Sequence, residues 1–143
     1  MESSRILFSF RYHLDTKENG VYIVKRFCSF LVAILSKTSV NLEKIKRQIL
    51  FLDVYPLFLE TATQATYDVQ FLSDILVLSK QLCCNSIVRF SYSSLDEFCI
   101  YLSNNGLLDF IQTCLTLRFD NENVFLLAFG CYSEIILNSC WIN

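Results

Sequence analysis

The chain contains only three glycines and one proline among its 143 residues, and this scarcity restricts its fold more than any other feature. Hairpins and tight turns depend on these two residues, because Gly adopts positive φ without strain and Pro fixes the backbone of a turn. A β-sandwich or barrel of this length would need many more of them. Since the composition shows no break along the chain, the sequence predicts one all-α domain covering residues 1–143.

Apolar residues recur at helical spacing along most of the chain, and short polar clusters separate one such segment from the next. We therefore expect a compact bundle of about seven to eight helices. The expected helices cover residues 6–14, 23–34, 42–52, 57–63, 66–84, 98–102, 107–115 and 124–138.

Several residues predict how these helices begin and end. Gly20 is expected to take positive φ behind the first helix, and Pro56 to lie in the first turn of a short helix. Residues 94–97, Ser-Leu-Asp-Glu, match a capping box, and residues 104–106, Asn-Asn-Gly, end the helix that follows it. Gly130 would allow a neighbouring helix to approach closely.

The spacing also predicts which side chains face inward. Lys46 is placed on the solvent side of its helix, where Glu43 and Arg47 are spaced for an ion pair. Segment 66–84 differs, because apolar residues cover most of its circumference, and we expect it to be the central helix of the bundle. The inward residues are expected to be Ile23, Phe27, Phe30, Leu31 and Ile34 in the second helix, and Leu107, Leu108, Ile111, Cys114 and Leu115 in the seventh.

Hydrophobic residues form 53% of the chain and charged residues 18%, so a domain of this size cannot hide all of its apolar surface. Some of that surface is expected to remain as a groove, a patch or a subunit interface. The net charge of −2 and the scattered Lys and Arg provide no basic face. We therefore expect no nucleic-acid partner.

The seven cysteines form no Cys-x-x-Cys pair, and neither a signal peptide nor an Asn-x-Ser/Thr site accompanies them. This usage is typical of a reducing compartment, so we expect a cytoplasmic protein. Residues 123–143 carry a single charge, Glu134, and an acidic residue costs about 2.5–3.5 kcal/mol at the centre of a membrane helix. We expect a buried helix there and no stable membrane span.

The sequence gives no positive evidence for catalysis. His13 is the only histidine, which excludes a zinc site built on paired His and leaves no nucleophile–His–acid set with supporting spacing. The vicinal Cys83 and Cys84 lie late in an apolar helix, where nothing activates a thiol. Asp96 and Glu97 already belong to the capping box. We expect no enzyme activity, no cofactor and no metal.

One known family fits these features in more detail. Residues 101–110, Tyr-Leu-Ser-Asn-Asn-Gly-Leu-Leu-Asp-Phe, resemble the second homology motif of the Bcl-2 family, in which Asn-Gly joins two short helices. Residues 5–14 are similar to the family's first helix, and residues 67–86 would take the place of its central hairpin helix. The family's Asn-Trp-Gly-Arg motif is not present, because residues 68–71 align with it and put Phe71 in place of the ligand-binding arginine. A compact chain with few motifs and no evident C-terminal anchor resembles the members carried by large DNA viruses.

The resemblance implies an inhibitor of apoptosis that captures the amphipathic death-motif helix of pro-apoptotic Bcl-2 proteins in a hydrophobic groove. It also implies a location in the host-cell cytoplasm and, through such partners, at the mitochondrial surface. Lys46 or Arg47 would supply the cation that faces the ligand's aspartate. The groove residues implied in this way are Arg47, Phe51, Leu52, Tyr55, Phe58, Asp68, Phe71, Ile75, Leu76, Gly106 and Leu107.

Three other interpretations stay open. The excess apolar surface could be a homodimer interface in a helical scaffold protein without a ligand groove. A helical enzyme or cofactor binder would reveal itself by a bound chromophore, metal or lipid. Peripheral membrane association is the third.

Overall fold

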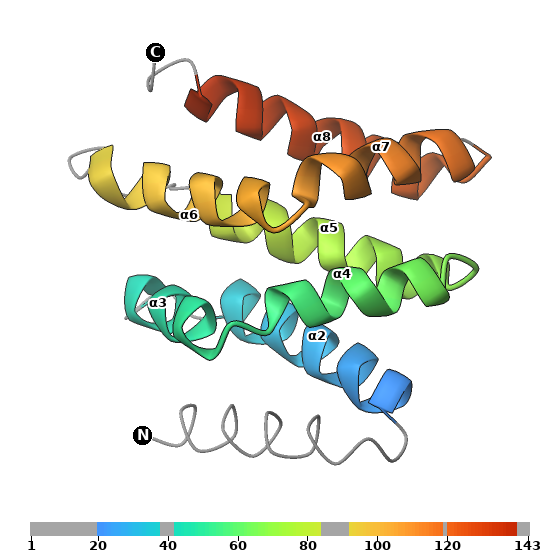
Figure 1. Cartoon of the computed structure of the whole chain (residues 1–143), viewed down its shortest axis with the longest axis horizontal. Coiled ribbons are helices and arrows are strands. Elements are labelled where there is room, and N and C mark those ends of the chain that lie inside the picture. The colour runs from blue at the N-terminus through green and yellow to red at the C-terminus, as the bar shows by residue number, and fades with distance from the viewer. Residues whose placement is uncertain (1–19, 38–41, 84–91, 119, 140–143) are drawn as a thin grey trace.

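The computed structural model describes residues 20–37, 42–83, 92–118 and 120–139. Within these ranges every regular element is an α-helix, which confirms the predicted all-α class (Figure 1). The predicted N-terminal helix at residues 6–14 lies outside the described residues, as do His13 and Cys84. The described helices are α2 (Gly20–Lys37), α3 (Leu42–Leu52), α4 (Tyr55–Gln64), α5 (Val69–Cys83), α6 (Tyr92–Asn104), α7 (Leu107–Leu117) and α8 (Glu122–Ser139).

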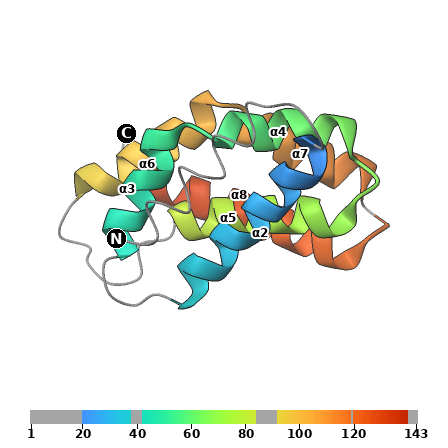
Figure 2. The ribbon, with the colours of Figure 1, turned by 90° about the horizontal axis from the view of Figure 1, so that it is seen from below.

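The helices pack in two layers. Helix α5 lies between α2 on one side and α8 on the other, and it packs against both (Figure 1). Helices α3, α4, α6 and α7 lie together on one side of this first layer (Figure 2). Because α5 also packs against α4, α6 and α7, it joins the two layers.

The composition of α5 explains this position. Only Gln70 and Lys80 are exposed along the whole helix. A fully buried Leu, Ile or Phe side chain contributes about 1.5–3 kcal/mol, so this helix carries a large share of the hydrophobic free energy of folding. Its buried residues are Phe71, Leu72, Ser73, Ile75, Leu76, Leu78, Ser79, Leu82 and Cys83.

Polar side chains and proline set the beginnings of three helices. Asp68 accepts a hydrogen bond through Oδ1 from the backbone N–H of Phe71 at 3.1 Å, and it thereby caps α5. Asn121 caps α8 in the same way, by accepting a bond from the backbone N–H of Val124 at 3.0 Å. Pro56 lies in the first turn of α4, as predicted, where its missing N–H costs nothing.

The buried faces of two helices differ from those predicted. In α2 the apolar residues extend around most of the helix, so the spacing alone did not fix which face turns inward. In α7 Leu108 is exposed and Phe110 is buried instead. In α2 the buried residues are Val24, Phe27, Cys28, Leu31 and Leu35.

Three expectations about helix ends and glycines were also wrong. Gly20 is the first residue of α2 and does not take positive φ, because the helix begins before the apolar stripe does. Helix α6 begins at Tyr92, so Ser94 lies inside it and not at its N-cap. A Cβ atom built on Gly130 would meet the side-chain nitrogen of Lys80 at 3.7 Å, so a side chain and not a helix backbone lies over this glycine.

Candidate functional site

Most of the predicted groove residues belong to the hydrophobic core. Phe58, one of these residues, packs its ring edge to face on the ring of Phe27 in α2, with centroids 5.8 Å apart. In the structure these residues therefore do not line an open groove. The helical spacing could not make this distinction, because core side chains and groove side chains share one periodicity. The buried members of the predicted set are Leu52, Tyr55, Phe58, Phe71, Ile75, Leu76 and Leu107.

The other predicted residues lie apart from one another. Phe51 is 80% exposed on the outer side of α3 and does not join the buried members. Arg47, on the same helix, forms an i,i+4 ion pair with Glu43 at 3.8 Å, as predicted. Lys46 is only 4% exposed, which contradicts its predicted position in solvent. Its ammonium group lies 5.9 Å from the ring centroid of Phe98, so cation–π attraction helps to hold it between α3 and α6.

Asp68 has a structural role. Besides capping α5, its Oδ2 atom pairs with the ammonium group of Lys25 on α2 at 2.5 Å. The hydrogen bond from Lys25 lowers the pKa of the Asp68 carboxyl below its ordinary value of 3.8, although partial burial opposes the shift. The ion pair fastens the start of α5 to α2.

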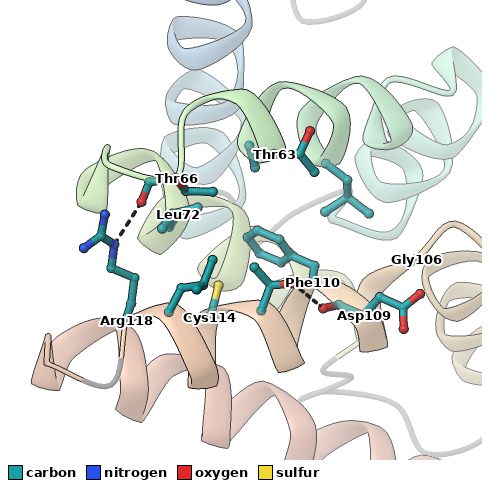
Figure 3. A pocket seen from close by; sticks show the side chains of 12 residues that line it. Thr63, Thr66, Leu72, Gly106, Asp109, Phe110, Cys114 and Arg118 are labelled. Atoms are coloured by element: carbon teal, nitrogen blue, oxygen red, sulfur yellow. Dashed lines mark hydrogen bonds between the residues drawn. The ribbon is translucent and has the colours of Figure 1, made fainter.

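A pocket opens between α4 and α7 (Figure 3). It encloses about 130 Å³. Its floor is apolar and buried, whereas Thr63, Asp109, Thr113 and Leu117 at its rim are exposed. The lining residues are Leu59, Ala62, Thr63, Thr66, Leu72, Gly106, Asp109, Phe110, Thr113, Cys114, Leu117 and Arg118.

The turn between α6 and α7 gives this pocket its geometry. Gly106 has φ of +99°, a backbone conformation that side chains with a Cβ adopt only with strain. Asn105 stabilises the turn by donating from its side-chain amide to the backbone oxygen of Tyr101 at 2.7 Å. The chain then enters α7 with Phe110, Cys114 and Leu117 turned toward the pocket. The predicted helix stop at residues 104–106 therefore also forms part of the site.

A positive and a negative side chain stand at opposite ends of the pocket (Figure 3). Arg118 follows α7, and its Nε–H donates to the backbone oxygen of Thr66 at 2.9 Å. Asp109 lies in the first turn of α7, near Gly106. In the part of the chain that the structure describes, neither Arg118 nor Asp109 forms an ion pair. The pocket can therefore offer one cation and one carboxylate to a bound molecule.

Cys114 and Cys83 are buried thiols with raised pKa values. Burial raises the pKa of Cys114, on the pocket floor, to about 12, so its thiolate is not populated at neutral pH. The pKa of Cys83 is also raised, first by a hydrogen bond with Cys99 and then by burial. Among the described residues, no group of three or more His, Cys, Asp and Glu could hold a metal ion.

Gly106 is one of the site residues predicted from the sequence, whereas Arg118 and the other residues that line the pocket are not. The available signal was the series 106, 110, 113, 114 and 117, which has the spacing of one helix face. That series contains three small or polar residues, Gly106, Thr113 and Cys114, whereas the series through Leu107 and Ile111 is more apolar. The residues predicted to face inward, Leu107, Leu108, Ile111, Cys114 and Leu115, share only Cys114 with the pocket series.

Three comparisons with known proteins provide no relative for this fold and pocket. No model of a protein family matches the chain, and no curated protein and no solved structure matches it.

Proposed function

We propose that this protein binds an amphipathic helix of a partner protein in the pocket between α4 and α7. The Bcl-2-like features of its sequence indicate a pro-apoptotic Bcl-2 protein as that partner, so that capture of its death-motif helix inhibits apoptosis. The position of α5 between α2 and α8, in contact with both layers, supports the proposal of a Bcl-2-like bundle with a central apolar helix. The observation that carries the binding proposal is an open apolar pocket with opposite charges at its two ends.

The size of the pocket supports a side chain as its occupant. A cavity of about 150 Å³ holds one benzene molecule. At about 130 Å³, the pocket is slightly smaller and accepts one aliphatic side chain such as Leu. The exposed Leu117 at the rim then extends the apolar surface to the next anchor of a bound helix. Apolar anchors at i, i+3 or i+4 spacing are the usual means by which a helix binds a groove.

The charges at the ends give the bound helix a direction. Death-motif helices carry an aspartate, and Arg118 supplies a cation to pair with it. This role falls to Arg118 because Lys46 is buried between α3 and α6, and Arg47 already pairs with Glu43. Asp109 would receive a basic residue of the ligand at the opposite end.

Calorimetric titration with a panel of pro-death helix peptides tests the proposal. We expect at least one peptide to bind with a Kd near or below about 1 μM. Arg118→Glu should weaken the binding of this peptide by tenfold or more, which is about 1.4 kcal/mol. A peptide that carries Lys in place of its aspartate should bind the Arg118→Glu variant more tightly than it binds the wild-type protein. Thr113→Trp, which places an indole over the pocket, should abolish binding.

Arg47→Glu is the matched control, because it reverses a cation of the same type on α3 and outside the pocket. It should leave the affinity unchanged. If Arg47→Glu weakened binding and Arg118→Glu did not, the ligand would occupy the groove predicted from the sequence, and the pocket proposal would be wrong. Failure of every peptide to bind the folded protein would contradict the function itself.

A further inference from the structure

Helix α8 has a continuous apolar face that is exposed to solvent. Phe125 is 37%, Leu126 60%, Phe129 57% and Tyr132 43% exposed, although each is a large hydrophobic side chain. At about 100° per residue, Phe125, Phe129 and Tyr132 fall within an arc of about 60°, and Leu126 borders it. Ile136, 42% exposed, continues the same line. Figure 1 shows α8 at the edge of the first layer, away from α2.

The arc formed by Phe125, Phe129 and Tyr132 contains no charged side chain. Helix α8 contains no Lys or Arg. Glu134 lies on the opposite side of the helix, whereas Glu122 lies one turn before Leu126 and about 20° outside the arc. A helix that binds an anionic membrane surface is rich in Lys and Arg on its own polar face. Helix α8 has neither, although the exposed Lys80 of α5 lies over Gly130. The face suits a partner surface that is equally neutral and apolar.

We propose that two copies of this chain associate through α8, with the two helices antiparallel about a twofold axis. An isologous contact requires a patch that complements itself. If the axis passes between positions 129 and 132, Phe129 of one copy meets Tyr132 of the second copy, and Phe125 meets Ile136. Every apolar side chain of the arc is then opposite another one.

The area agrees with a reversible dimer. A Phe or Tyr side chain offers 150–250 Å² in total, so the exposed parts of the four leading residues sum to roughly 400 Å² per copy. Two copies would remove roughly 800 Å² from water through these side chains, and flanking residues would bring the total near the 1,000–1,200 Å² at which specific interfaces begin. Aromatic enrichment and the lack of charge at the centre are also typical of interface cores. We expect association in the micromolar range.

Sedimentation velocity of the full chain tests the proposal. The weight-average mass should rise from the monomer value of 16.6 kDa toward twice that value as the concentration increases from about 2 to about 200 μM. Phe129→Glu and Tyr132→Lys should each raise the dissociation constant by about tenfold or more. Phe51→Glu, an equal change at an 80% exposed site on α3, should leave it unchanged. Circular dichroism should show that all three variants keep the helical content of the wild type.

Mixing Phe129→Glu with Tyr132→Lys tests the orientation. In the antiparallel register the heterodimer contains one Glu–Lys pair and one intact Phe–Tyr pair, so the mixture should associate more tightly than either variant alone. A parallel register would put position 129 opposite itself, and mixing would not restore association.

A wild-type protein that stays monomeric at every concentration, or that loses association equally with Phe51→Glu, would overturn the proposal. So would a monomer that binds neutral lipid vesicles through Phe129. The variants should retain peptide binding at the α4–α7 pocket, so the two proposals fail independently.

Discussion

The hydroxyl groups of Tyr55 and Ser79 lie 2.5 Å apart, and both side chains are completely buried. Ser79 donates its own proton to the backbone oxygen of Ile75 at 2.7 Å. The Tyr55 hydroxyl therefore donates to Ser79 and not the reverse. This bond links α4 to α5 through the interior, at a position where the sequence predicted the wall of an open groove.

Because Tyr55 is the donor, removing the acceptor and removing the donor should lower the free energy of unfolding by different amounts. Ser79→Ala leaves the buried Tyr55 hydroxyl without an acceptor and should lower the free energy of unfolding by about 1–3 kcal/mol. Tyr55→Phe leaves Ser79 bonded to Ile75 and should cost only about 0.5–1.5 kcal/mol. The double variant should resemble Tyr55→Phe, because it contains no orphan donor. Urea denaturation measures all three, and a larger loss from Tyr55→Phe would reverse the assigned donor.

The ion pair between Lys25 and Asp68 makes stability depend on pH. The pKa of Asp68 is lower in the folded than in the unfolded chain. The ion pair therefore contributes its full stabilisation when the pH is above the pKa of the unfolded chain, and it loses this stabilisation as the pH falls through the pKa of the folded chain. The pKa of Lys25 is raised from 10.5, so the same contribution also disappears in strongly alkaline solution.

Asp68→Asn isolates the charge in this pair, because Asn caps a helix about as well as Asp. At about pH 7 the variant should be less stable by about 0.5–1 kcal/mol, a modest value since both partners are partly exposed. The difference should decrease as the pH falls through the folded pKa of Asp68, which is below 3.8, and should vanish once the wild-type carboxyl is protonated. A difference that persisted in acid would show that the cap, and not the ion pair, had been damaged.

Burial should protect five thiols from alkylation in the native protein. Burial raises the pKa values of Cys114 and Cys131 to about 12, and that of Cys28 well above 9.0. We expect iodoacetamide to modify these residues only as fast as the protein unfolds, as measured by mass spectrometry of their peptides. Modification of Cys114 at the rate of the unfolded chain would mean that the pocket floor opens to solvent. The five protected residues are Cys28, Cys83, Cys99, Cys114 and Cys131.

The sequence was sufficient to predict which segments form helices, because each described helix has apolar residues at helical spacing and a polar break at its end. It was not sufficient to predict which apolar residues face a ligand. Leu107 and Phe110 differ by less than one helical turn and both are buried, yet only Phe110 also lines the pocket. That difference depends on the angle at which α7 leaves the turn at Gly106, which is a tertiary property. Lys46 illustrates the same limit, since its burial depends on Phe98 of a helix about fifty residues later.

Substitution by alanine should lower the stability of the protein at Gly106 and raise it at Gly130. Gly106 has φ of +99°, where a Cβ costs about 1–2 kcal/mol, while the space around it is adequate because the nearest atom, Cδ1 of Leu59, would lie at 3.7 Å. Gly106→Ala should therefore destabilise the protein through its backbone alone. Gly106→Asn should cost less, since Asn adopts the left-handed region more readily.

Gly130 is the matched control, because a Cβ there would also meet its nearest atom at 3.7 Å but within the regular helix α8. Gly130→Ala should stabilise the protein by about 0.5–1 kcal/mol, since it reduces the backbone freedom of the unfolded chain. Urea denaturation of the three variants measures both signs. If Gly106→Ala were as stable as the wild type, positive φ at this turn would not be needed, and the orientation of α7 that forms the pocket would have another cause.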